Sequence, residues 1–300
     1  MSVIDRRDFV KSVSVAAGAT VLAGANSVMA AEKKMEAGKS SSMKTIYEVF
    51  ALKYAGPLDR PGAMTFFNQG YKDVIQINYY IWAIRAKNGE TTLVDTGTGK
   101  AWGPKFTGFF PPEQMVARLG IKPEQVTRIV VTHMHFDHIG GITDFAQAFP
   151  AAKFYVQKTE FDFWVNSPIS QRAPFKLLQN PDANKAFGEL AKGPRVIQIN
   201  GDMVIGPDMQ LLLAPGHTPG LQTVLIPTAK GQTIVGSDSA HLFRSFKEDI
   251  PSGLITNLPI WMETYDKLRF NAPVENMFPG HDVKMLTDFP KVAEDITQLA

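Results

Sequence analysis

Apolar runs of two different periods alternate along the chain after residue 45. Short β-branched runs between turn residues predict strands, and apolar positions three and four residues apart predict helices. An Asn88-Gly89 pair separates the first two strand-like runs and predicts a hairpin. The predicted strands span residues 73–86, 90–95, 128–132, 153–157, 209–213, 223–226, 233–235 and 275–278. The predicted helices span residues 112–119, 143–149, 158–165 and 260–268.

Residues 166–194 interrupt this alternation. Four prolines and several asparagines predict an irregular, partly helical insertion, and a loop of this length is typically functional or disordered. Together with residues 161–164 it could form a lid over a binding site. Apolar residues of other loops could form a groove for an acyl chain, although core packing is the simpler explanation for any one of them. These residues are Trp102, Phe106, Phe109, Phe110, Phe136 and the 64–67 loop (MTFF).

The N-terminus has the organisation of an export signal. A charged start precedes an uncharged small-residue run over 12–28, and a cleavage-type sequence ends at Ala30. Arg6 and Arg7, with Phe9 behind them, resemble the twin-arginine signal. We therefore expect a twin-arginine signal peptide over 1–30 and export to the periplasm by the Tat machinery. A Sec-type signal or an N-terminal anchor is the alternative.

The remainder of the chain is expected to be one domain. Residues 31–45 are polar and predict a flexible lead-in, so the domain spans 46–300. No second apolar run reaches the length of a membrane span, so we expect none in the mature chain. The sequence does not indicate an oligomeric state.

Composition excludes several classes of protein. The chain has 300 residues, 44% of them hydrophobic, so collagen-like, coiled-coil and disordered classes do not fit. A net charge of +2 gives no reason to expect nucleic acid as a partner. The absence of cysteine excludes disulfides, thiolate zinc sites, iron–sulfur clusters and a cysteine nucleophile.

Candidate chemistry is concentrated in the sequence THMHFDH, which follows a predicted buried strand directly. His133 and His135 can point at one centre, while Asp137 and His138 reach a second centre beside it. Imidazole and carboxylate suit zinc, and four such groups beside a buried strand are costly unless they are coordinated. The sequence therefore predicts a metal site, and a solvated polar loop is the alternative.

Three further segments each place one ligand-type side chain just beyond an apolar strand. They are residues 211–220 with His217, residues 234–238 with Asp238, and residues 277–282 with His281. In folds that combine a sheet with helices, ligand-binding sites tend to lie at the carboxyl ends of the strands. Gly216 and Gly280 would let the backbone pass close to a metal cluster.

This set of residues resembles the metallo-β-lactamase superfamily. The resemblance consists of H-x-H-x-D-H over residues 133–138 followed by His217, Asp238 and His281, and it includes the early Asp95 in the sequence LVDTG. It runs from about residue 73 to the C-terminus. The resemblance implies an α+β fold, namely a single-domain αββα four-layer sandwich with the metals at one edge.

Within the superfamily, the sequences APGHTPG (214–220) and PGHD (279–282) are most similar to the quorum-quenching N-acyl-homoserine lactone lactonases. The resemblance implies two Zn²⁺ ions per chain and a lactone or ester substrate, opened by a hydroxide between the ions. It places one zinc on His133, His135 and His217, and the second on Asp137, His138 and His281, with Asp238 bridging the two. It implies Asp137, Asp238 and His241 as the catalytic residues.

Two positions differ from the lactonase pattern. The lactonases have a tyrosine, thought to polarise the substrate carbonyl, three residues after the bridging aspartate, where this chain has His241. A histidine can donate a hydrogen bond and shuttle a proton, so we expect His241 to act on the carbonyl; a supporting or surface role is the alternative. Leu221 stands where a histidine commonly follows Pro-Gly.

Other reactions remain open because a fold alone does not select one. A thioesterase or phosphoester hydrolase of the same fold, similar to glyoxalase II, is the main alternative. A β-lactamase fits less well because such enzymes generally lack the bridging carboxylate that Asp238 offers. A non-enzymatic zinc-binding protein would not need the complete ligand set.

Overall fold

Strand β2 (Val74–Ala86) contributes to two hydrophobic layers at once. In the computed structural model, which describes residues 46–300, Tyr79 and Ile81 pack in one buried cluster while Tyr80 and Trp82 pack in another. Successive side chains of a strand point to opposite faces, so β2 is covered on both sides. This part of the sheet therefore lies inside the protein.

Hydrogen bonds join the strands in the order β11-β10-β9-β1-β2-β3-β4-β5-β6, with β8 and β7 attached through β9, and β13 and β12 through β1. Their bounds are β1 (Tyr47–Pro61), β3 (Thr91–Val94), β4 (Val126–Val130), β5 (Lys153–Gln157), β6 (Val196–Ile199), β7 (Met203–Ile205), β8 (Met209–Leu213), β9 (Gln222–Thr228), β10 (Gly231–Ser237), β11 (Met277–Pro279), β12 (Lys291–Ala293) and β13 (Ile296–Gln298). The predicted signal peptide and lead-in, residues 1–45, lie outside the described residues.

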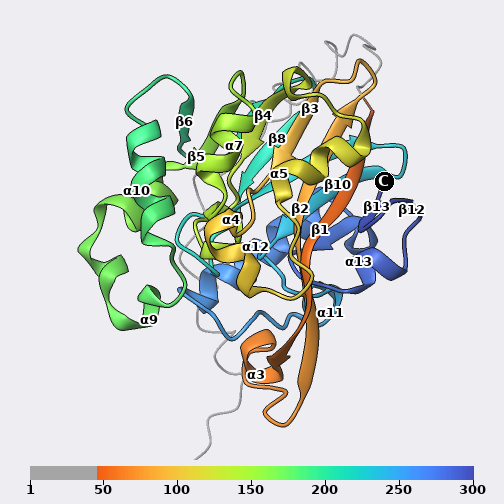
Figure 1. Ribbon diagram of the computed structural model, residues 1–300. Coiled ribbons are helices and arrows are strands. Elements are labelled where there is room, and N and C mark those ends of the chain that lie inside the picture. The colour runs from red at the N-terminus through yellow and green to blue at the C-terminus, as the bar shows by residue number, and fades with distance from the viewer. Residues whose placement is uncertain (1–45) are drawn as a thin grey trace, which may run out of the picture. The chain divides into compact units, whose positions relative to one another are not determined.

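The helices are mostly short. They are α3 (Gly62–Thr65), α4 (Gly99–Trp102), α5 (Pro112–Met115), α6 (Phe136–Ile139), α7 (Ile142–Ala148), α8 (Lys158–Phe161), α9 (Ala173–Lys176), α10 (Pro181–Leu190), α11 (Phe243–Glu248), α12 (Leu258–Asn271) and α13 (Lys284–Thr287). Figure 1 shows α9 and α10 on the β6 side and the long β1–β2 hairpin running to α3 at its tip. Within residues 46–300 no helix is long and apolar enough to cross a membrane.

Three buried clusters separate four layers. The middle cluster combines inward-facing residues of β1 to β4 with those of β8 to β10, so it lies between two groups of strands. The second cluster covers the other face of β1 and β2 and includes residues of α7 and α10. The third packs β9 and β10 against α11 and α12. The predicted αββα sandwich is thereby confirmed.

The structure corrects two parts of the sequence-based description and confirms a third. Residues 47–61, which were left without an element, form the longest strand, β1. Its apolar pattern is interrupted around Gly56-Pro57, where the pairing with β2 shifts register. The insertion over 166–194 is partly helical, as predicted, and its longest helix is α10, which the Asn180 side chain caps by accepting from Ala183 N at 3.2 Å. The strand predicted over 275–278 is not the last, because β12 and β13 follow it.

Candidate metal centre

The candidate ligands follow four strands of the fold. His133, His135, Asp137 and His138 come after β4, and His217 comes after β8. Asp238 follows β10, and His281 follows β11. All seven side chains are buried and lie in one cluster, although more than 140 residues separate the first from the last. The structure thus brings together every metal ligand that the sequence predicted.

Asp238 lies between two groups of histidines. Its Oδ1 is 3.5 Å from His138 Nε2 and 3.2 Å from His281 Nε2. Its Oδ2 is 3.4 Å from His217 Nε2 and 3.9 Å from His133 Nε2. One carboxylate therefore faces both groups, as a bridging ligand would.

The rings of three histidines are oriented by hydrogen bonds that point away from the cluster. The Nδ1–H groups donate as follows: His138 to Asp95 Oδ2 at 2.7 Å, His217 to the Leu254 carbonyl at 2.8 Å, and His281 to the Asn78 carbonyl at 2.9 Å. This leaves the Nε2 atom of each ring facing the centre. Such partners fix the ring and the tautomer of metal-binding histidines.

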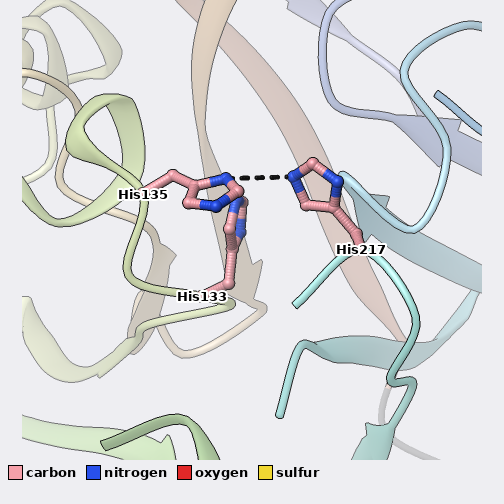
Figure 2. A group of neighbouring side chains, drawn as sticks. All are labelled: His133, His135 and His217. Carbon is pink, nitrogen blue, oxygen red and sulfur yellow. Dashed lines mark hydrogen bonds between the residues drawn. The ribbon is translucent and has the colours of Figure 1, made fainter. Parts of the chain in front are cut away.

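His133, His135 and His217 form one half of the cluster (Figure 2). His135 Nδ1 lies 3.0 Å from His217 Nε2, and the two rings come from opposite loops. Two unprotonated nitrogens at this distance repel each other unless a proton or a cation lies between them. The other half comprises Asp137, His138 and His281, whose ligand atoms also lie within 4.8 Å of one another.

Several buried atoms of the cluster have no hydrogen-bond partner among the described residues. They are the Nε2 atoms of His133, His138 and His241, and Oδ1 of Asp238. Unsatisfied buried polar atoms are rare in native proteins because each costs free energy. Coordination to metal ions would satisfy the atoms of His133, His138 and Asp238, so these residues fit a metal centre with two ions, while His241 Nε2 is left to act on a bound molecule.

Burial and neighbouring charges shift the pKa values of several cluster residues. Burial lowers the pKa of His133 and His135 well below the usual range, so both rings are neutral, the form that binds metal. Burial opposes charge on His138 as well, but Asp137 and Asp238 outweigh it and raise its pKa to about 10. Burial alone would raise the pKa of Asp238, yet the surrounding histidines hold it well below its usual value.

Gly280 makes room for the cluster, as predicted, whereas Gly216 makes room for Trp261. A Cβ on Gly280 would lie 2.0 Å from Asp238 Oδ1, and a Cβ on Gly216 would lie 2.4 Å from Trp261 Cβ. Gly216 also has a φ of +139°, which strongly favours glycine. Any larger residue at either position would displace a candidate ligand or its support.

Glu160 is a functional residue that sequence analysis missed. Its side chain is fully buried, and Oε1 accepts from Met134 N at 2.9 Å and from Trp164 Nε1 at 2.7 Å. Oε2 accepts from Gly220 N at 2.8 Å. Met134 lies between two ligands and Gly220 lies three residues after His217, so one carboxylate connects the two ligand loops. A single acidic residue early in a helix gives no signal of this role.

His241 also lies at the cluster. It is buried, and its Nε2 is 3.1 Å from Asp238 Oδ2. Burial lowers the pKa of His241 to about 4, so the ring is neutral near pH 7. The surface position that sequence analysis left open is therefore wrong.

A cavity gives access to the cluster. Its walls are His135, Asp137, Asp238, His241 and His281 together with Arg60, Met64, Thr65, Ile77, Phe136, Leu178 and Leu254. Of the predicted groove residues, only Met64, Thr65 and Phe136 reach this lining. Trp102 and Phe106 pack behind Phe136, at ring distances of 5.9 and 6.0 Å. Arg60 gave no sequence signal.

The predicted lid takes two different places. Phe161 and Trp164 are buried, and the centre of the Trp164 ring lies 5.3 Å from that of His135. These two side chains therefore pack behind the site and do not cover it. The insertion contributes Leu178 to the cavity wall. The Leu178 carbonyl accepts a hydrogen bond from Phe136 N at 2.9 Å.

Comparison with known proteins gives three results. A family model described as the metallo-β-lactamase superfamily matches residues 74–281. An N-acyl homoserine lactonase from a Bacillus species is 30% identical over 186 residues, which cover 60% of this chain and 66% of that protein. A hydroxyacylglutathione hydrolase of Xanthomonas campestris is 29% identical over 139 residues, which cover 46% of this chain and 39% of that protein. The chain thus spans just under two thirds of the length of the lactonases that it matches.

A solved structure shows the same fold. AidC, described as a dizinc quorum-quenching lactonase in complex with a product, superposes with a TM-score of 0.63 at 23% identity. The superposition covers 80% of this chain and 89% of AidC.

Proposed function

Because this chain belongs to the metallo-β-lactamase superfamily, we propose that it is a hydrolase with two zinc ions that opens a lactone ring, as in N-acyl-homoserine lactones. The observation that carries the proposal is the placement of Asp238, whose two oxygens face two groups of buried histidines. The similarity to N-acyl homoserine lactonases supports the choice of a lactone.

We assign one ion to His133, His135 and His217, the other to Asp137, His138 and His281, and the shared contact to Asp238. The donors are imidazoles and carboxylates without thiolate, which suits zinc. When bound there, zinc would supply an acidified water molecule as nucleophile and Lewis-acid polarisation of the substrate carbonyl.

The protein's own residues then complete the reaction. Asp238 Oδ2 and His241 Nε2 lie 3.1 Å apart. They are therefore placed to move the proton that the attacking water loses to the leaving alkoxide. His241 takes the place of the lactonase tyrosine, because a neutral imidazole can donate a hydrogen bond to the substrate carbonyl. Ile77, Phe136 and Leu254 in the cavity wall exclude bulk water from the reacting groups.

A thioester is the second candidate substrate. The similarity to a hydroxyacylglutathione hydrolase favours it, although that match covers less than half of either protein. A thioester carbonyl presents the same electrophile to the site and differs in its leaving group.

Turnover by the zinc-loaded protein on three substrates tests the proposal. These are N-hexanoyl-homoserine lactone, an S-acyl glutathione and bis(p-nitrophenyl) phosphate. We expect the highest kcat/KM on the lactone and almost no turnover by Asp238→Asn. The matched control is Asp266→Asn, because Asp266 is exposed and its ion pair is with Arg269, away from the cluster. Faster thioester or phosphodiester hydrolysis would overturn the lactonase assignment.

We also propose that the protein is exported to the periplasm by the Tat machinery. Arg6 and Arg7 ahead of an uncharged small-residue run support this proposal.

A further inference from the structure

Arg60 brings a positive charge into the cavity above the metal centre. It is the only lysine or arginine among the described residues that line this cavity. Arg60 lies near the end of β1, and Ile77 of β2 lines the same wall. The β1–β2 hairpin contributes no candidate metal ligand, so it brings a cation to the site independently of the ligand loops.

The Arg60 guanidinium is held in place by Tyr79. Its Nη2 donates to the Tyr79 hydroxyl, and its central carbon lies 6.0 Å from the centre of the Tyr79 ring. Tyr79 is itself 1% exposed and packs edge-on against the His281 ring at 5.2 Å. Arg60 is therefore tethered to the wall of the metal site and is not a freely moving surface side chain.

Among residues 46–300 no carboxylate forms an ion pair with Arg60, and Asp137 and Asp238 attract it only at longer range. Arg128, which is also partly buried, pairs with Glu90 at 2.7 Å, and Arg195 donates to three backbone carbonyls. The Nε atom of Arg60 is buried without any hydrogen-bond acceptor among the described residues. A partly buried cation without a counter-ion is costly, so an acceptor supplied by a ligand would stabilise it.

The metal centre does not provide that counter-ion. Asp137 and Asp238 are the carboxylates that share the cavity, and both belong to the assigned ligand set. Two divalent ions bring more positive charge than these two carboxylates offset, so the loaded cavity attracts anions. A carboxylate is the anion that the planar guanidinium matches best alongside phosphate.

We propose that Arg60 binds a carboxylate that the substrate carries apart from its scissile carbonyl. The substrate class is then a lactone or ester with a free carboxylate, and Tyr79 positions Arg60 to receive it. This inference rests on the proposed hydrolase function, and it names a feature that a neutral N-acyl-homoserine lactone lacks.

Two matched lactones test the inference. One is γ-butyrolactone-γ-carboxylate, and the other is its methyl ester, which is uncharged and one methyl group larger; opening of the lactone ring is measured for both. We expect the zinc-loaded protein to prefer the carboxylate, and Arg60→Met to lower the ratio of kcat/KM values (carboxylate over ester) about 10- to 100-fold through KM. Arg60→Lys should retain part of the preference.

Arg244→Met is the matched control. Arg244 also packs against the hairpin, 4.8 Å from the Phe66 ring, but it pairs with Glu248 and lies outside the cavity wall. Its replacement should leave the ratio unchanged. Equal kcat/KM for both lactones, unaltered in Arg60→Met, would overturn the inference while the hydrolase function stands.

If neither lactone is hydrolysed, turnover of N-hexanoyl-homoserine lactone still decides the proposed function, and a binding measurement decides whether Arg60 holds a carboxylate. Calorimetric titration of glutarate into the zinc-loaded protein is the measurement. Affinity at least about 10-fold weaker in Arg60→Met than in the wild type would support the carboxylate site. Equal affinity in the two proteins would contradict it.

Discussion

Asp238 lies between the two halves of the histidine cluster, with His281 Nε2 at 3.2 Å from both of its carboxylate oxygens. His138 faces Oδ1 and His217 faces Oδ2, at 3.5 and 3.4 Å. Because Gly280 has no Cβ, the carboxylate can lie against the backbone at this point. A single side chain thereby joins two groups of ligands into one centre.

His241→Ala is expected to reduce kcat about 10²- to 10³-fold, because it removes a donor aimed at the substrate carbonyl or the leaving oxygen. Metal content should stay at the wild-type value, as measured by elemental analysis. His241→Tyr should recover part of the rate, since a phenol can donate the same hydrogen bond. If His241→Ala loses a metal, His241 is a ligand and its proposed role is wrong.

Zinc binding to the metal-free protein near pH 7 is expected to release protons. Although burial opposes charge on His138 and His281, the nearby carboxylates raise both pKa values, that of His138 to about 10. His138 therefore carries a second ring proton at pH 7, which zinc must displace, and the raised pKa of His281 acts in the same direction. Apparent zinc affinity should fall as the pH falls. A pH indicator in weakly buffered solution measures the release, and zinc uptake without it would contradict the assignment of these two ligands.

The sequence indicated the ligands but not the residues that position them. Four ligands lie within six positions after a strand, and this density is visible without a structure. Glu160 and Arg60 each look like ordinary surface charges in the sequence. Their roles depend on Gly220 and Tyr79, which are 60 and 19 residues away, and only the folded chain brings them together.

At the scale of elements, the loops after β4 and β8 depend on each other through Glu160. Glu160→Gln keeps the side-chain volume but replaces one acceptor oxygen by an amino group, which leaves a backbone N–H such as that of Gly220 without a partner. We expect zinc affinity to fall about 10- to 100-fold and the free energy of unfolding to fall by about 1–3 kcal/mol.

Competition with a chelator of known affinity measures the first effect, and denaturant unfolding the second. The matched control is Glu189→Gln, because Glu189 is exposed and pairs only with Lys192. Wild-type zinc affinity in Glu160→Gln would contradict the connection between the two loops.

Strands with a clean apolar pattern were predicted from the sequence and others were not. Residues 153–157 and 209–213 match β5 and β8, because their runs are bounded by turn residues. The pattern did not predict strand β1, because Gly56-Pro57 separates an apolar first half from a more polar second half. Both halves are extended because they pair with β2. The order of strands depends on pairings between distant segments, such as β1 with β13, which no local pattern encodes.

At the scale of the whole molecule, the four-layer fold followed from the family resemblance and not from periodicity. β2 is buried on both faces, so its sequence reads as one apolar run and does not reveal how many layers cover it. The twin-arginine assignment of the segment before residue 46 depends on the sequence alone.

Fusion of residues 1–35 to a reporter should direct that reporter to the periplasm. Replacing both Arg6 and Arg7 by lysine should block its export, because the twin-arginine signal is read by a receptor. Cell fractionation measures the outcome. The control changes Lys33 and Lys34, which lie after the predicted signal peptide, to arginine, and it should leave export unchanged. Export that survives the double replacement would indicate a Sec-type signal or an anchor instead.

The central claim is a centre for two metal ions, and the metal content of the purified protein tests it most directly. Elemental analysis of the protein over residues 31–300, loaded with zinc and freed of excess by gel filtration, should give two zinc ions per chain. Asp238→Asn should bind clearly fewer, because both halves of the cluster share that carboxylate. One ion or none per wild-type chain, with the ligand residues intact, would contradict the dinuclear centre.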